Sequence, residues 1–272
     1  MKNCPDLRVM TFNVLNANSG QHTGPWRLRK KPVAMAIWAY GPDLLGAQEL
    51  QRKQADFLCE QLREYDFVSP GRDKGVLAGQ SVAIYFRSGR FRLIDAGFFW
   101  FSKKPDQPGS RNWGAVAPRM CTWVRLADLR CGDERPFVFF NAHFDALSRW
   151  ARFRSAEILR DRIAAIAGSD PAVIAGDFNA NAHRKLYQAV LAGPGGGRLC
   201  LQDAYRLANP KRQLMEGTWH GRGLRFRRRL DWILQTPNFD VIDAAIDHAK
   251  RNGRYPSDHF PVTATLRWQA DA

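Results

Sequence analysis

The sequence has few cysteines, and none of them lies in a disulfide-rich or metal-binding pattern. Among its 272 residues are five cysteines, widely scattered and never spaced as a CxxC pair: Cys4, Cys59, Cys121, Cys131 and Cys200. An odd number at such spacing argues against a disulfide framework and against a zinc site. We therefore expect these residues to be reduced and mostly buried thiols.

The sequence also lacks long hydrophobic segments. Its longest apolar runs, at residues 34–40 and 137–140, are far shorter than the roughly 20 residues that cross a bilayer. Residues 1–6 lack the apolar stretch of about 7–15 residues that a secretory signal needs. We therefore expect a cytoplasmic protein with no membrane span.

Several common catalytic motifs are absent as well. The sequence contains no GxSxG elbow, no GxxxxGK(S/T) phosphate loop and no HExxH metal motif. The Gly221-Arg222-Gly223 segment lacks the third glycine and the preceding strand of a dinucleotide-binding fingerprint. These absences argue against the enzyme classes that depend on those motifs.

Acidic residues are in deficit. The chain has 41 lysines and arginines against 26 aspartates and glutamates, which gives a formal net charge of +15 at pH 7. This excess attracts polyanions, which include nucleic acid, an anionic membrane surface and phosphorylated small molecules. Charge alone does not select among them.

The hydrophobic pattern alternates between strands and helices. Short apolar runs predict buried strands at residues 7–14, 44–48, 81–86, 120–126, 137–143, 172–175, 230–234 and 262–268. Helical patterns occupy residues 27–40, 51–64, 148–167 and 184–191. Because no low-complexity linker divides these elements, we expect one α/β domain over residues 1–272.

Polar side chains stand where these strands begin or end. Asn13 and Glu49 end the first two strands, and His143 ends another. Further carboxylate, amide and imidazole groups adjoin the last three strands: Asp177, Asn179, Asp231, Asp258 and His259. Their shared position predicts a site at one rim of a sheet.

These residue types narrow the chemistry. Carboxylate and amide oxygens are ligands suited to Mg²⁺ or Mn²⁺. Beside imidazoles and many arginines, they suit phosphoester hydrolysis, in which cationic groups stabilise the phosphoryl oxygens while a carboxylate takes a proton from water. The sequence therefore predicts a metal-dependent phosphoesterase.

The polar segments, taken in order, closely resemble the endonuclease/exonuclease/phosphatase superfamily. The matching motifs are TFNV at residues 11–14, QE at 48–49, NAHFD at 141–145, GDFN at 176–179, LDWI at 230–233 and SDHFPV at 257–262. GDFN and SDHFPV are the most specific of them. The resemblance implies a four-layered α/β sandwich, in which two mixed β-sheets pack face to face with helices outside, and an Mg²⁺-dependent phosphoesterase.

The resemblance also implies which residues bind metal. Glu49 matches the principal Mg²⁺ ligand, Asn13 matches an amide that assists at the metal or phosphate, and Asp258 lies near the metal. Apurinic endonucleases place an acid two residues after the first asparagine, whereas this sequence has Leu15. A metal contact of that type is therefore not expected here.

The catalytic residues follow from the same resemblance. His143 and His259 match residues that contact the scissile phosphate, and Asp231 matches the residue that orients the imidazole of His259. Asp177 matches the carboxylate that orients or deprotonates the attacking water, and Asn179 an amide that helps hold the phosphate. Family members differ in whether the aspartate or the histidine is the general base. We favour Asp177, because a carboxylate near Mg²⁺ stays ionised.

Three further residues are candidates for the site, and two of them also have a structural interpretation. The segments NWGAVAPR at 112–119 and GTWHG at 217–221 look like a bacterial branch of the superfamily. In that branch Arg119 is a candidate phosphate ligand, and Trp219 and His220 are candidates to line the substrate cleft. The alternatives are a fold-stabilising ion pair for Arg119 and a place in the core for Trp219.

Two basic tracts bear on the substrate. Residues 222–229 carry five arginines, including Arg225 and Arg227, and residues 27–31 form a second cluster. Near the active rim they would contact phosphates that flank the scissile one, as a polynucleotide requires. The alternative is a solvated basic surface.

The substrate hypotheses follow from these tracts. We expect a monomeric nuclease or phosphodiesterase acting on DNA or RNA, with hydrolysis of small phosphate esters, such as sugar phosphates or lipid headgroups, as the alternative. A catalytically silent nucleic-acid-binding module is disfavoured because all the matched catalytic residue types are present.

Overall fold

Two six-stranded β-sheets form the centre of the protein. The computed structural model describes residues 4–20, 23–74, 79–131, 134–182, 185–192, 199–221 and 228–269. The strands of the first sheet lie in the order β11 (Phe239–Ile246), β12 (Val262–Trp268), β1 (Leu7–Asn13), β2 (Leu44–Leu50), β4 (Ser81–Arg87) and β3 (Tyr65–Val68). Those of the second lie in the order β5 (Phe91–Trp100), β6 (Met120–Asp128), β7 (Pro136–His143), β8 (Ala172–Asp177), β10 (Asp231–Gln235) and β9 (Gln202–Asp203).

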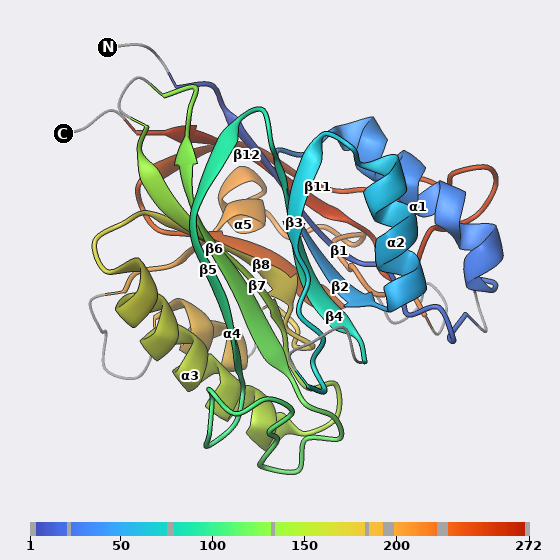
Figure 1. The fold of residues 1–272 in the computed structure, drawn as a ribbon, viewed down its shortest axis with the longest axis horizontal. Helices are drawn as coiled ribbons and strands as arrows, with labels where there is room; N and C mark the ends of the chain where they lie inside the picture. The colour runs from blue at the N-terminus through green and yellow to red at the C-terminus, as the bar shows by residue number, and fades with distance from the viewer. Residues whose placement is uncertain are drawn as a thin grey trace.

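Helices cover the outer faces of the two sheets. These helices are α1 (Trp26–Tyr40), α2 (Arg52–Gln61), α3 (Arg149–Ala167) and α4 (Lys185–Leu191). The short α5 (Ala204–Ala208) instead packs against β10 and β11, with Ala204 and Tyr205 in the core between the sheets. Figure 1 shows α1 and α2 on the outside of the first sheet and α3 and α4 on the outside of the second. This arrangement confirms the four-layered α/β sandwich that the family resemblance implies.

Three hydrophobic layers hold the sandwich together. Between the sheets, Leu7 and Ile84 pack with Phe139 and Ile233. The α1 and α2 helices cover the first sheet through one cluster, and α3 and α4 cover the second through another. Central strands are therefore buried on both faces, which is why they appear in the sequence as nearly continuous apolar runs.

A polar network joins the two sheets inside this core. The Nε2 of Gln48, on β2, donates to the Oδ1 of Asn141, on β7, at 2.7 Å. The Nδ2 of Asn141 donates in turn to the carbonyls of Ala47 and Ala83 in the first sheet. Gly46 permits this close approach, since a Cβ there would lie 2.9 Å from Asn141. Gln48 directly precedes Glu49, and Asn141 lies two residues before His143. The network therefore fixes the spacing of the two sheets near the rim.

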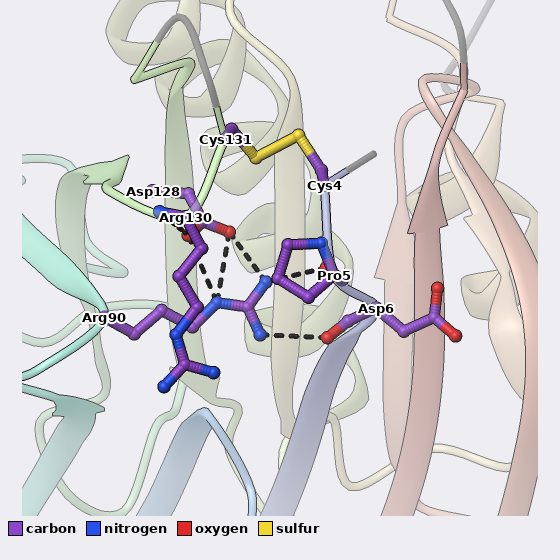
Figure 2. Close-up of a disulfide and its surroundings, with 7 residues drawn as sticks. All are labelled: Cys4, Pro5, Asp6, Arg90, Asp128, Arg130 and Cys131. Atoms are coloured by element: carbon purple, nitrogen blue, oxygen red, sulfur yellow. Dashed lines mark hydrogen bonds and ion pairs between the residues drawn. A yellow bond between two sulfur atoms is a disulfide. The ribbon is translucent and has the colours of Figure 1, made fainter. Parts of the chain in front are cut away.

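A disulfide links Cys4 to Cys131, as Figure 2 shows. The expectation of reduced cysteines is therefore wrong for this pair. Three cysteines are free, and of these Cys121 is buried, Cys59 is partly buried and Cys200 is exposed. The two bonded residues lie 127 positions apart, so their spacing in the sequence gave no sign of the pairing. Structural disulfides persist mainly in oxidising compartments, so the bond does not support the expectation of a cytoplasmic protein.

A buried arginine stabilises the chain beside the disulfide. The guanidinium of Arg90 pairs with Asp128 at 2.7 Å and with Asp43 at 2.8 Å. It also donates to the backbone carbonyls of Pro5 and Asp6 (Figure 2). The segment that leads into β1 is thus held by both a covalent bond and a charged network.

None of the helices in the described ranges is long and apolar enough to cross a membrane.

We predict that Cys131→Ser lowers the free energy of unfolding by about 2–4 kcal/mol, because the bond closes a long loop. Urea unfolding without reductant, followed by tryptophan fluorescence, measures the change. Cys200→Ser removes an exposed free thiol and is the matched control. Equal unfolding midpoints for the wild type and Cys131→Ser would contradict the prediction.

Candidate active site

The polar residues at the ends of the strands lie together at one rim of the sandwich. The strands β1 and β2 run parallel, as do β7 and β8, so the strands of each pair end at the same edge. In the second sheet, Asp177 lies opposite His143 on one side and opposite Asp231 on the other. Asn13, at the end of β1, reaches across to Asp177 from the first sheet. The rim therefore combines residues from both sheets.

Asp177 is the centre of this group. Its Oδ2 accepts a hydrogen bond from Asn13 at 3.0 Å and lies 3.5 Å from the Nε2 of His143 and 3.9 Å from the Nε2 of His259. Its Oδ1 accepts a hydrogen bond from the backbone nitrogen of Asn179 at 2.9 Å. The carboxylate is buried and fixed on both oxygens, as a catalytic group requires.

Asp231 orients the imidazole of His259. The Nδ1 of His259 lies 2.8 Å from the Oδ2 of Asp231, so its Nε2 is directed toward Asp177. Thr218 holds this strand end, because its hydroxyl oxygen accepts hydrogen bonds from the backbone of Leu230 and Asp231. The structure thus brings together the pair that the sequence predicted.

The surroundings of three buried side chains in this cluster shift their pKa values. Burial, and then the negative charge of Asp231, raises the pKa of Asp177 to about 7. Burial opposes protonation of His259, but the carboxylates of Asp231 and Asp177 outweigh it and raise the pKa of His259 well above its usual value. Burial and the charge of Arg119 lower the pKa of His143 well below its usual value. At neutral pH His259 is therefore a cation and His143 is neutral.

Glu49 is held beside Asp177 by two asparagines. Asn13 donates through Nδ2 to the Oε1 of Glu49 at 3.3 Å, and Asn16 donates to its Oε2 at 2.9 Å. Burial alone would raise the pKa of Glu49, but hydrogen bonds, led by those from Asn16, lower it. The amide oxygen of Asn13 accepts a hydrogen bond from the backbone of Leu15, so its nitrogen faces both carboxylates. Sequence reasoning missed Asn16, although it lies three positions after Asn13 in the same loop.

Three non-glycine residues at the rim adopt left-handed backbone conformations. The φ angles are 55° at Leu15, 64° at Glu49 and 48° at Asn179. Such conformations are uncommon and cluster at functional sites, where the surrounding structure enforces them. At Leu15 and Asn179, hydrogen bonds from the backbone nitrogen provide that enforcement.

The contacts of Arg119 fit both of its interpretations, a fold-stabilising ion pair and a phosphate ligand at the site. It forms an ion pair with Asp145 at 3.5 Å, and its Nη1 lies 3.1 Å from the Nε2 of His143. Arg72, which sequence reasoning missed, lies near Arg119. Burial lowers the pKa of Arg72 most, the charge of Arg119 lowers this pKa further, and the charge of Glu49 raises it. The buried Nε atoms of both arginines lack a hydrogen-bond partner in the described part of the chain. Each Nε lies near a carboxylate instead, that of Arg119 at 3.5 Å from Asp145 and that of Arg72 at 3.8 Å from Asp73. Two ion-paired guanidinium groups therefore lie near His143.

The remaining predicted residues lie in different settings. Asp258 lines a cavity of about 560 Å³. Its Oδ2 and the Nε1 of Trp219 both approach Gly221, where a Cβ would lie 3.0 and 2.9 Å from them. Trp219 therefore lies beside Asp258. His220 is buried, with its ring stacked on Phe260 at 4.2 Å, so its surroundings support a packing role rather than a place in the cleft.

The basic tracts give a mixed outcome. Arg225 and Arg227 lie outside the described residues. Arg27 is exposed, but Arg29 is fully buried, so neither phosphate contact nor a solvated surface describes it. The Arg29 guanidinium donates hydrogen bonds to five backbone carbonyls, those of Val14, Leu15, Asn16, Gly24 and Pro256. Arg29 thus ties the loop after β1 to the segment that precedes Asp258.

The rim residues fit a divalent cation. Glu49, Asp177 and Asp231 bring carboxylates together beside one protonated histidine, and the buried Oδ1 of Asp231 has no hydrogen-bond partner in the described ranges. Such an excess of buried negative charge favours a bound cation, and oxygen donors suit Mg²⁺. Within the same ranges, the ligating atoms of Asp177, Asp231 and His259 lie within 4.8 Å of one another.

The comparisons with known proteins agree with this geometry. The sequence model of the Endonuclease/Exonuclease/phosphatase family matches residues 10–259. This chain belongs to that family, whose members are hydrolytic phosphoesterases. No curated protein sequence matches the chain.

Solved structures of the family resemble the chain over nearly its whole length. An endonuclease/exonuclease/phosphatase from Bacteroides vulgatus is 29% identical, covers 97% of this chain and 99% of its own, and has a TM-score of 0.85. A mannosyl-6-phosphatase from Bacteroides thetaiotaomicron is 30% identical, with coverages of 96% and 100% and a TM-score of 0.82. TDP2 from D. rerio, complexed with a single-strand DNA product, is 17% identical, with coverages of 96% and 99% and a TM-score of 0.75, and shares the fold.

We predict that Arg29→Lys lowers kcat/KM by about 100-fold, because lysine cannot donate to all five carbonyls and the loops that carry Asn16 and Asp258 lose their alignment. Steady-state kinetics at a temperature where circular dichroism shows a folded protein measures the loss. Arg27→Lys, on the exposed side of the same helix, is the control. Unchanged kinetics in folded Arg29→Lys would show that the arginine does not position the site.

Proposed function

We propose that the chain is a Mg²⁺-dependent phosphoester hydrolase in which Asp177 is the general base. The observation that supports this role most directly is the position of Asp177, whose carboxylate faces Asn13, His143 and His259 at the rim. A base works best when its pKa lies near the operating pH, and burial has raised that of Asp177 to about 7.

Asp177 takes a proton from the attacking water, which forms the new P–O bond as the bond to the leaving oxygen breaks. His259, held by Asp231 as a cation, binds the scissile phosphate, with His143, Asn179 and Arg119 as further contacts. These groups stabilise negative charge on the phosphoryl oxygens as the transition state forms.

Glu49 is the proposed principal metal ligand, with Asp258 nearby. His259 and Asp231 already bond each other, whereas the hydrogen bonds on Glu49 hold it in the ionised form that a cation requires. When bound, Mg²⁺ supplies a Lewis acid that polarises the phosphoryl oxygens. The contacts of Asn13 favour a positioning role for this residue, which holds Glu49 and Asp177 at a fixed spacing.

Two substrate classes are supported by different observations. The net charge of +15 favours DNA or RNA, whose phosphates attract a basic protein. Similarity to the mannosyl-6-phosphatase favours a small phosphate ester. Because the site draws on both sheets, we also propose that the chain acts as one domain.

We predict Mg²⁺-dependent hydrolysis of at least one member of a panel containing DNA, RNA, an abasic duplex, sugar phosphates, inositol phosphates and sphingomyelin. EDTA abolishes the activity, and Asp177→Asn lowers it by about 10²–10⁴-fold, the usual contribution of a general base. Asp66→Asn, on an exposed edge strand, is the control for the same chemical change. Hydrolysis that persists in EDTA, or in Asp177→Asn at the wild-type rate, would contradict the proposal.

A further inference from the structure

A second cavity adjoins the candidate active site and shares one residue with it. This cavity has a volume of about 410 Å³ and lies between the first turn of α3, residues 179–181, the start of α4 and the residues that precede β10. Figure 1 shows α3 and α4 together on the outer face of the second sheet. Asn179 lines the cavity, while its backbone nitrogen bonds Asp177. A group bound in the cavity would therefore lie next to the phosphate that Asp177 faces.

The cavity is strongly basic. Among the described residues, its lining contains four cationic side chains and no carboxylate: Arg149, Arg152, Lys185 and Arg228. In the described part of the chain, Arg149, Lys185 and Arg228 form no ion pair. By contrast, two arginines close to them in sequence are paired, Arg154 with Glu157 and Arg229 with Asp203. Burial lowers the pKa of Arg152 and the nearby carboxylate of Asp145 raises it, whereas the other three cations have no carboxylate partner in the described residues. Such cations repel one another, so a bound anion would stabilise this arrangement.

The first turn of α3 adds to the positive charge. The amino end of a helix carries a partial positive charge and normally favours acidic side chains. The first turn of this 19-residue helix contains no acidic residue, and it contributes Arg149 and Arg152 to the cavity instead. Basic residues in the first turn destabilise an isolated helix. They suit a bound phosphate, which both the backbone N–H groups and the basic side chains attract.

The cavity that Asp258 lines has the opposite character. The described residues that line it are Leu15, Ala17, Asn18, Ser19, Gly20, Thr23, Pro25 and Asp258, which include a carboxylate and no lysine or arginine. A second anion is therefore favoured in the cavity that Asn179 lines and disfavoured in the cavity that Asp258 lines.

We propose that the cavity lined by Arg149, Arg152, Lys185 and Arg228 binds a second phosphate group of the substrate, adjacent to the phosphate that is hydrolysed. This inference rests on the proposed hydrolysis at Asp177. A polynucleotide and a small bisphosphate both supply this chemistry, and the enzyme prefers either of them to its counterpart with one phosphate.

Matched substrate pairs test the subsite. The first pair is hexose 6-phosphate and hexose 1,6-bisphosphate, and the second is the dinucleotides TpT and pTpT, with phosphorus NMR identifying the ester that is cleaved. In the class that is hydrolysed, we expect the second phosphate to raise kcat/KM about tenfold, mainly through KM. The double variant Arg149→Gln/Lys185→Gln should bring this ratio close to one. Arg154→Gln, which changes an exposed arginine of the same helix, should keep the wild-type ratio.

The outcomes separate this inference from the proposed function. Equal kcat/KM within the wild-type pair, or a ratio that the double variant retains, overturns the subsite while hydrolysis stands. If no pair is hydrolysed, calorimetry with the same four compounds decides the inference on its own. Tighter binding of the doubly phosphorylated compound that the double variant loses supports the subsite, and equal affinities overturn it.

Discussion

The hydrogen bond between Gln48 and Asn141 is the contact on which the rest of the structure depends, because the proposed active site is divided between two sheets. Glu49 directly follows Gln48 on the first sheet, and His143 lies two residues after Asn141 on the second. A buried amide pair with a 2.7 Å bond tolerates little sliding, since a shifted sheet would leave polar groups without partners. The spacing of the sheets is thereby fixed beside the residues that need it.

Electrostatics gives the rim its chemical character. Carboxylates from both sheets meet beside a single protonated histidine, which favours a cation at the centre of the site. Arg72 and Arg119 lie around this centre, and each forms an ion pair with an aspartate. A negatively charged centre with positively charged groups around it suits a metal and a phosphate together. The metal offsets the charge of the carboxylates, and the phosphate offsets the charge of the arginines.

Whether a strand could be predicted from the sequence depended on how deeply the strand is buried. All eight interior strands were predicted, because strands covered on both faces are nearly continuous apolar runs. The four strands that were missed, β3, β5, β9 and β11, are the four edges of the two sheets. Edge strands are partly exposed or very short, so polar residues interrupt their pattern, as in β5 and β11. The Cys4–Cys131 pairing was missed because long-range contacts leave no local signal.

The candidate site was predictable where its residues belong to motifs at strand ends. Asn13, Glu49, Asp177, Asp231 and His259 do so, and the structure brings them together. Arg72 follows an edge strand that the pattern did not show. Arg29 lies in a tract interpreted as either phosphate contacts or a solvated surface, whereas it is buried. Nothing in the sequence distinguishes an arginine that binds five carbonyls from one that faces water, because burial depends on the tertiary fold.

The central claim is that Glu49 anchors a divalent cation at this rim. Crystals soaked in Mn²⁺, with anomalous difference maps for the wild type and for Glu49→Ala, test it most directly. We predict a peak in contact with the Glu49 carboxylate that is lost in Glu49→Ala. A peak held by Asp177, Asp231 and His259 without Glu49, or no peak at the rim, would contradict the claim.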